Sequence, residues 1–332
     1  MTSVTDGIPP APLLKVDNLR KWFDIRRGII PRPVAHVRAV EDVSFHLMPR
    51  EVLGIAGESG SGKTTVGRCV LRLIEPTNGK VVFNGRDVAS LSPGELRRFR
   101  REAQIVFQDP YGALNPGKSI ERILAEPFRV QRVDLSKSER RERIAELLRT
   151  VALSPDYMER RPHELSGGQR QRIVIARAIA MQPEMIVADE PVSALDVSIQ
   201  AQIIALLQKL KEQLALSLLF ISHDLAVMEY LSDRIAVVYL GRVMEVGPAA
   251  EICSRPHHPY TRALLSAVPS RAGVNGRQRI ILSGELPDPM SPPSGCVFRT
   301  RCPFAIKACA DAVPPLRKRG EDHLSACIRD DI

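Results

Sequence analysis

A glycine-rich segment, GESGSGKT at residues 57–64, constrains the fold of this chain more than any other stretch. It matches the pattern G-x-x-x-x-G-K-[ST] and follows EVLGIA (51–56), a continuous apolar run typical of a strand buried on both faces of a parallel sheet. Its glycines let the backbone wrap around phosphate, and the N–H groups that open the next helix favour anionic oxygens. Lys63 can reach the β- and γ-phosphates of a nucleotide, and the Thr64 hydroxyl can serve Mg²⁺. The segment predicts an α/β fold with a phosphate site after a central strand.

Hydrophobic periodicity predicts further elements before residue 183. EDVSFHLMP (41–49) and GKVVFNGRDV (79–88) alternate as half-buried antiparallel strands do, and the second ends in an Asn-Gly turn. Residues 95–182 read as mostly helical, with a capping box formed by Ser136 and Glu139. We therefore expect an antiparallel region followed by a helical region.

Beyond residue 183, buried strands alternate with helices again. EMIVAD (184–189) and SLLFIS (217–222) are continuous apolar runs, and Asp196 is placed to N-cap the helix between them. RIAVVYLGRVMEVG (234–247) is typical of a hairpin. After about residue 250 prolines and cysteines become frequent and periodicity fades. This shift predicts two domains, one over residues 12–250 and one over residues 251–332.

Two acidic residues, Asp189 and Glu190, end the strand EMIVADE. An aspartate at this position can hold Mg²⁺ through its water shell. A neighbouring carboxylate can orient and polarise an attacking water. Taken alone, the pair could equally be solvated and without function, so its meaning depends on the rest of the chain.

The stretch LSGGQRQRIVIARAIA (165–180) indicates whether Asp189 and Glu190 are functional. Ser166, Gly167 and Gly168 form a small flexible loop, and Gln169 opens an apolar helix. This second helix N-terminus, with free N–H groups and a hydroxyl, suits another face of a triphosphate. With LSGGQRQR between the phosphate loop and VADEP, the chain resembles the ATPase subunit of an ATP-binding cassette (ABC) transporter.

The resemblance implies a P-loop NTPase fold. Its α/β core is of the RecA type, with an antiparallel β subdomain, a helical subdomain and here a small Cys/Pro-rich C-terminal extension. By resemblance, Glu190 is the base or water-positioning residue, Gln108 in VFQDP is the Q-loop glutamine, and His223 in ISHD is the switch histidine that contacts the γ-phosphate. Phe23 looks like the residue that stacks on adenine, with Trp22 as the alternative.

The resemblance also implies a complete set of ligand contacts for ATP and Mg²⁺. The implied ATP-binding residues are Phe23, Gly57, Glu58, Ser59, Gly60, Ser61, Gly62, Lys63, Thr64, Thr65, Gln108 and His223, and the implied Mg²⁺ site comprises Thr64, Gln108 and Asp189. In this family two subunits pack head to tail, so each ATP also meets the LSGGQ loop of the other subunit. That loop is Ser166, Gly167, Gly168 and Gln169 here, and the D-loop is Ser193, Ala194, Leu195 and Asp196.

Several stretches outside these motifs resemble oligopeptide/dipeptide importers. They are RRGIIPRPVAHVRAVEDVSF, DPYGALNP, PHHPYTRALLSAVP and GELPDPMSPPSGCVFRTRCPFA. The resemblance implies an ATP-hydrolysing subunit that powers peptide import. Its implied partners are a second homologous ATPase subunit in a heterodimer, two transmembrane permease subunits and, indirectly, an extracytoplasmic solute-binding protein.

No apolar run approaches the ~20 residues needed to cross a bilayer, and the N-terminus has no secretory-signal pattern. We therefore expect a peripheral protein on the cytoplasmic face of the inner (plasma) membrane.

The net charge of +9 raises an alternative, a non-transport ABC ATPase acting on nucleic acid or ribosomes. The basic residues, however, are scattered in mixed-sign runs, and aromatic residues are only 5%, which leaves little material for base stacking. Repair ATPases of this type insert long coiled coils between the phosphate loop and the signature, and ribosome factors carry two cassettes. This chain has neither feature, so no nucleic-acid partner is expected.

Four cysteines, Cys296, Cys302, Cys309 and Cys327, gather in the C-terminal part. Disulfides are a poor explanation in a reducing compartment. Four thiolates can ligate a [4Fe–4S] cluster, and Cys302-Pro303 is similar to the Cys-Pro step of some cluster proteins. Zinc sites usually contain C-x₂₋₄-C pairs, which are missing from this sequence, and reduced, unligated thiols are the third alternative. Related importer ATPases carry [4Fe–4S] in this extension, so the resemblance implies the cluster rather than zinc.

Overall fold

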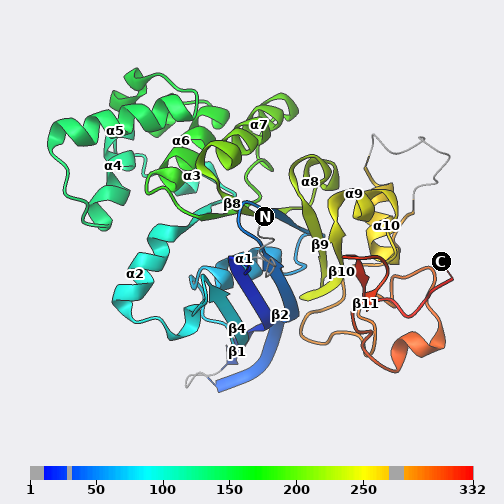
Figure 1. The fold of residues 1–332 in the computed structure, drawn as a ribbon. Coiled ribbons are helices and arrows are strands. Elements are labelled where there is room, and N and C mark those ends of the chain that lie inside the picture. The colour runs from blue at the N-terminus through cyan, green and yellow to red at the C-terminus, as the bar shows by residue number, and fades with distance from the viewer. Residues whose placement is uncertain (1–10, 28–31, 269–279, 332) are drawn as a thin grey trace, which may run out of the picture.

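The structure, a computed structural model, describes residues 11–27, 32–268 and 280–331 (Figure 1). Ten of its strands follow one another across a sheet in the order β5-β4-β1-β2-β10-β9-β3-β8-β7-β6, and β12 joins at β10 with β11 beside it. The strands are β1 (Leu14–Arg27), β2 (Arg32–Leu47), β3 (Val52–Ala56), β4 (Asn78–Phe83), β5 (Arg86–Asp87), β6 (Ala103–Val106), β7 (Met185–Asp189), β8 (Ser217–Ser222), β9 (Arg234–Tyr239), β10 (Arg242–Pro248), β11 (Arg317–Lys318) and β12 (Leu324–Ser325).

The centre of the sheet is parallel and buried on both faces. β3 lies between β8 and β9, and β7 and β6 extend the parallel set beyond β8. Along β3, Val52 and Ala56 pack into one hydrophobic cluster, whereas Leu53 and Ile55 pack into another on the opposite face. This alternation confirms the predicted buried strand before the phosphate loop.

The predicted antiparallel region is confirmed. β1 pairs with β2 on one side and β4 on the other, and these strands form the blue part of the molecule low in Figure 1. Val43, Phe45 and Leu47 are buried on one face of β2. Asn84 (φ 48°) and Gly85 (φ 72°) connect β4 to β5, and positive φ at both residues is the requirement of a tight type I′ hairpin turn.

The described helices include a separate green group, α3 to α7, at the upper left of Figure 1. The helices are α1 (Lys63–Val70), α2 (Pro93–Glu102), α3 (Pro110–Ala113), α4 (Ile120–Val130), α5 (Lys137–Thr150), α6 (Gly167–Ile179), α7 (Val197–Leu214), α8 (Leu225–Leu231), α9 (Ala249–Ser254) and α10 (Pro259–Ser266). The capping box of Ser136 and Glu139 forms at the start of α5 as predicted. The helical reading of residues 95–182 missed β6, whose four residues are too few to show a period of two.

Two local predictions beyond residue 183 have different outcomes. Asp196 occupies the N-cap position of α7, but its side chain makes no capping hydrogen bond to the described helix. The hairpin of β9 and β10 forms as predicted, with Leu240 (φ 45°) and Gly241 (φ 68°) in the turn. None of the helices in the described ranges is long and apolar enough to cross a membrane.

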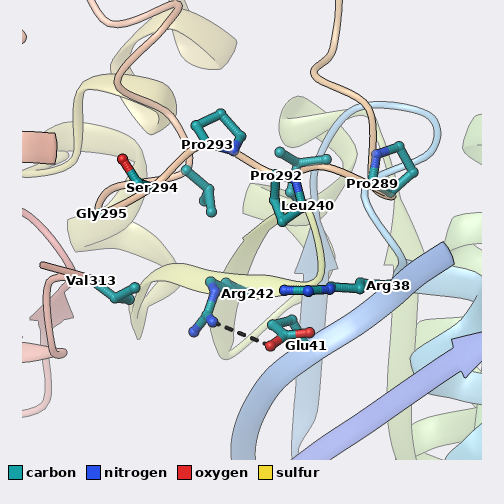
Figure 2. Close-up of a pocket in the computed structure, with 11 residues that line it drawn as sticks. Arg38, Glu41, Leu240, Arg242, Pro289, Pro292, Pro293, Ser294, Gly295 and Val313 are labelled. Atoms are coloured by element: carbon teal, nitrogen blue, oxygen red, sulfur yellow. Dashed lines mark ion pairs between the residues drawn. The ribbon is translucent and has the colours of Figure 1, made fainter. Parts of the chain in front are cut away.

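The chain after β10 returns to the sheet. β12 pairs with β10, and Phe298 is fully buried in the same cluster as residues of the parallel sheet. Figure 2 shows residues 289–295 passing over β2 and β10, where Arg242 forms an ion pair of 3.6 Å with Glu41. Arg38 N–H donates to the Pro289 carbonyl at 3.2 Å. The C-terminal segment is thus packed onto the sheet.

Candidate functional site

A cavity of about 770 Å³ lies at the carboxyl end of β3, within the size range of small-molecule sites. Residues from the phosphate loop and the start of α1, from β1 and β2, from three later loops and from α10 line it: Phe23, Val37, Ala39, Gly57, Glu58, Ser59, Gly60, Gly62, Lys63, Thr64, Thr65, Gln108, Glu190, His223 and Leu264. In open α/β sheets ligands bind beyond the carboxyl ends of the strands. All the residues predicted to bind ATP line this cavity except Ser61, a loop residue that is fully buried.

The phosphate loop depends on glycine at two positions. Gly57 (φ 151°) and Gly62 (φ 103°) adopt backbone conformations that other residues rarely reach. A Cβ on Gly57 would collide with the Val238 carbonyl, and one on Gly62 would collide with the Ala39 carbonyl. The loop therefore packs against the backbones of β9 and β2.

Lys63 lies within this loop rather than in open solvent. Its Nζ donates to the carbonyls of Gly57 and Glu58 at 2.7 Å each. Burial lowers the pKa of Lys63, although the carboxylates of Glu190 and Asp189 act in the opposite direction. The ammonium is held against the loop in a residue that lines the cavity, which suits it to neutralise phosphate oxygens.

Thr64 lines the cavity and is hydrogen-bonded to Asp189, which does not line it. The Thr64 hydroxyl donates to Asp189 Oδ1 at 2.8 Å. Asp189 is 2% exposed, and burial raises its pKa against the opposing hydrogen bond from Thr64. Mg²⁺ in nucleotide sites takes one or two protein oxygens, with phosphates and water supplying the rest, so a single carboxylate beside a hydroxyl fits that ion.

Glu190, Gln108 and His223 converge from the ends of three neighbouring strands. Gln108 Nε2 donates to Glu190 Oε2 at 3.1 Å, and His223 Nδ1 lies 3.4 Å from the same oxygen. β6, β7 and β8 are adjacent and parallel, which brings the segments after them to one edge. The missed strand β6 is therefore what delivers Gln108 to the site.

Glu190 also has an unusual backbone. Its φ of 45° is in the left-handed region, which costs a residue with a Cβ about 1 kcal/mol or more. Its N–H donates to the Ile221 carbonyl at 2.9 Å, and its carbonyl accepts the Ser193 hydroxyl at 3.1 Å. These bonds hold the strained residue and tie the predicted D-loop to it.

The aromatic alternatives, Phe23 and Trp22, point to different surroundings. Phe23 lines the cavity and is 38% exposed. Trp22 donates from its indole to Glu41 Oε2 at 2.8 Å and lies under the Arg38 guanidinium. This placement favours Phe23 as the aromatic residue beside a base.

The LSGGQ loop does not line this cavity in the described chain. Ser166 N-caps α6, where its hydroxyl accepts the Gln169 N–H at 3.3 Å and Gln169 Oε1 accepts the Ser166 N–H at 3.0 Å. A Cβ on Gly167 would lie 3.3 Å from Leu195 of the predicted D-loop. The signature is an ordered helix N-terminus away from the phosphate loop of its own chain.

The four predicted metal-ligating cysteines lie in one part of the C-terminal segment. Cys309 and Cys327 are buried, Cys296 and Cys302 are partly buried, and Cys296 N–H donates to the Cys309 carbonyl at 2.8 Å. Among the described residues, however, no three His, Cys, Asp or Glu side chains form a group that could hold a metal ion. The [4Fe–4S] and zinc predictions are thus not supported.

Burial raises the pKa of Cys296, Cys302 and Cys327, for Cys302 to about 11, because the protein interior solvates a thiolate less well than water does.

Sequence reasoning missed some residues at the cavity. Val37, Ala39 and Leu264 line it. Leu264 comes from α10, in a stretch that was used above only for its resemblance to oligopeptide/dipeptide importers. Arg301 and Tyr260 contact the phosphate loop at Glu58. Such contacts join residues more than two hundred positions apart, so periodicity and spacing carry no signal for them.

Comparison with known proteins agrees with this architecture. A family model described as ABC transporter matches residues 40–193, and one described as oligopeptide/dipeptide transporter, C-terminal region, matches residues 244–309. The dimeric structure of a post-hydrolysis state of the ATP-binding cassette MJ0796, bound to ADP and Pi, superposes with a TM-score of 0.63 at 31% identity. It covers 71% of this chain and 98% of that one.

Relatives align over nearly the whole chain. A putative peptide import ATP-binding protein of Brucella ovis is 54% identical over 97% of this chain and 99% of its own length. The oligopeptide transport ATP-binding protein AppF of Bacillus subtilis is 50% identical over 95% of this chain and 96% of its own.

The chain belongs to the ABC transporter family and has its ATPase fold. Within that family its full-length relatives are peptide import ATP-binding proteins, and it shares the C-terminal region of oligopeptide/dipeptide transporters.

Proposed function

We propose that this chain binds and hydrolyses ATP and that hydrolysis powers the import of di- and oligopeptides through separate permease subunits. One observation supports this most strongly: the phosphate loop and the Glu190–Gln108–His223 group meet at one cavity, with Asp189 bonded to Thr64 beside it, in a chain that also carries the peptide-transporter C-terminal region. The relatives named above carry peptide import or oligopeptide transport in their names, which supports the same substrate class.

The residues at the cavity divide the chemistry between them. Bound Mg²⁺ would offset charge on the phosphates, and Thr64 and Asp189 are the oxygens placed to hold it. Lys63 and the loop N–H groups would stabilise charge on the transferring phosphoryl group. Glu190 would orient and polarise the attacking water, with Gln108 and His223 holding its carboxylate.

We infer that the complete site needs a second ATPase subunit. The Ser166–Gln169 loop is an ordered helix N-terminus that does not line its own cavity among the described residues, which suits it to face the ATP of a partner. The solved structure of the MJ0796 cassette is dimeric, which supports pairing of this kind. A homologous but different subunit as the partner, giving a heterodimer, remains our prediction from the sequence.

The wider assembly is part of the same proposal. Two transmembrane permease subunits would place the chain on the cytoplasmic face of the inner membrane, and a solute-binding protein would deliver peptide from the other side. Affinity purification of the tagged chain from gently solubilised membranes tests this. We expect permease subunits and a second ATPase to co-purify, whereas recovery of ribosomes or DNA without permeases would contradict the proposal.

The metal content of the C-terminal segment needs a separate measurement. The sequence resemblance implied [4Fe–4S], with zinc and free thiols as alternatives, and the described cysteines form no metal-binding group. Iron, sulfide and zinc should be determined after anaerobic purification of the wild-type chain and of Cys302→Ser. Stoichiometric iron and sulfide that are lost in the variant would restore the cluster prediction, and their absence with four alkylatable thiols would support free thiols.

A further inference from the structure

Glu58 is the one carboxylate within the GESGSGKT loop, and it lines the proposed ATP cavity. A triphosphate carries several negative charges, so an unpaired carboxylate at this place would oppose its binding. The chain therefore needs a positive group that neutralises Glu58 without occupying the cavity.

Arg301 supplies that group. Its Nη1 donates to Glu58 Oε2 at 2.6 Å and its Nη2 donates to Glu58 Oε1 at 3.2 Å, which is a two-pronged guanidinium–carboxylate pair. The Arg301 side chain is 9% exposed and that of Glu58 is 29% exposed, so the pair is partly shielded from solvent screening. The contact joins the C-terminal segment to the phosphate loop across 243 positions of sequence.

A second contact from the same segment holds the backbone of Glu58. The Tyr260 hydroxyl, on α10, accepts the Glu58 N–H at 2.8 Å. Tyr260 is fully buried and packs edge-on against Tyr239, with ring centroids 4.7 Å apart, and Phe298 lies against both rings. Both the side chain and the main chain of Glu58 are thus held by residues that follow β10.

The turn that presents Arg301 is itself ordered. Arg301 N–H donates to the Phe298 carbonyl at 3.0 Å, and the guanidinium lies 5.9 Å from the centre of the Tyr239 ring. Fixing the arginine before ligand arrives reduces the conformational entropy lost on binding.

We propose that Arg301 is a positioning residue for ATP binding: it pairs with Glu58, removes the negative charge of the phosphate loop from the path of the triphosphate and holds the loop in its binding conformation. This inference rests on the proposed function, because it assigns Arg301 to the same ATP site. It gives the C-terminal segment a role in the ATP site, in addition to its packing on the sheet.

The test measures the affinity of the full-length chain for ATPγS by calorimetry and the kcat and KM of ATP hydrolysis by the complex that the chain forms with its co-purified subunits. Arg301→Gln should weaken binding and raise KM for ATP on the order of tenfold, the size expected for loss of a charged hydrogen-bond partner, while kcat changes by less than about threefold. Arg301→Lys keeps the charge but loses the fork geometry, so its loss should be smaller. Unchanged affinity in Arg301→Gln would overturn the proposal.

A charge-cancelling variant separates electrostatic positioning from simple docking of the segment. In Arg301→Gln with Glu58→Gln, no unpaired carboxylate remains, and affinity should return to within about threefold of wild type. If the double variant binds ATPγS as weakly as Arg301→Gln alone, Arg301 acts only by holding the segment in place. That result would overturn the proposal that Arg301 neutralises the charge of Glu58. Arg299→Gln is the matched control, since Arg299 lies in the same turn but donates to Ser294 and not to the phosphate loop.

The proposed function is checked independently in the same experiment. Wild-type chain should bind ATPγS and Lys63→Ala should not. If wild type binds no nucleotide, the ATP site itself fails and Arg301 has no ligand to position. If wild type binds ATPγS and the Arg301 variants bind it equally well, the proposed ATP site stands and the role of Arg301 is wrong.

Discussion

The phosphate loop and the turn that carries Cys296, Arg301 and Cys302 hold their key groups in different ways. In the loop, Lys63 donates to the carbonyls of Gly57 and Glu58, only a few positions away. In the turn, Arg301 contacts Glu58 and Tyr239, which are distant in sequence. A motif whose contacts are local can be recognised from its amino-acid sequence, whereas a site built from long-range contacts cannot.

The largest expected effect concerns the cavity that the phosphate loop shares with Glu190. Glu190→Gln should reduce ATP hydrolysis by at least about 100-fold and leave ATP binding in place, because it removes the group that would polarise the water. Phosphate release and nucleotide affinity are the measurements. Glu184→Gln is the control. Glu184 directly precedes the same strand, is exposed and accepts a hydrogen bond from Asn84 Nδ2 at 2.9 Å. The hydrolysis rate of this variant should therefore stay within about twofold of wild type. Equal loss in both variants would remove Glu190 from its proposed role.

The second effect concerns how the C-terminal segment is attached. His323 Nε2 lies 2.8 Å from Glu245 Oε1, with side-chain exposures of 1% and 0%. His323→Ala would leave the buried carboxylate with the backbone N–H groups of His257 and His258 but without its ion-pair partner, and should lower the free energy of unfolding by about 3 kcal/mol. Urea denaturation measures this. His36→Ala, which removes an exposed histidine paired with Asp24, should change the same quantity by less than about 0.5 kcal/mol; similar values for the two variants would contradict a buried anchor.

A third prediction concerns the chemistry of the turn. Burial raises the pKa of Cys302 to about 11. At pH 8 its alkylation by iodoacetamide should be about tenfold slower in the folded chain than in urea, after allowing for the greater nucleophilicity of a high-pKa thiolate. Peptide mass spectrometry follows the rate. Equal rates in the two states would show that the turn is exposed and that the thiol is not shielded as described.

The smallest effect is a pH dependence of stability. Although burial lowers the pKa of His323, its hydrogen bonds and charge interactions with Glu245 and Glu251 outweigh this and raise it. A histidine whose pKa is raised on folding stabilises the protein fully below its unfolded value near 6.5, and this contribution is lost as pH rises through the folded pKa.

The stability difference between wild type and His323→Gln should therefore shrink between pH 6 and pH 9. Urea denaturation at each pH measures it. A difference that is constant or grows with pH would show that His323 is neutral in the folded chain.

The sequence by itself determined the ATPase core. A buried strand, a glycine loop and a helix follow one another directly, so the letters specify the backbone that surrounds the phosphates, as φ at Gly57 and Gly62 shows. The apolar runs before Asp189 and Ser222 likewise predicted the strands that carry the catalytic candidates.

Only the tertiary structure decided three other matters. The strand β6 is four residues long and lies after a helix, so pairing with β7, not periodicity, makes it a strand and brings Gln108 to Glu190. Phe23 rather than Trp22 lines the cavity because successive side chains on a strand point to opposite faces and Trp22 is engaged by Glu41. Arg301 meets Glu58 because the C-terminal segment folds back onto the sheet, and such a contact depends on packing between distant elements, which no local pattern encodes.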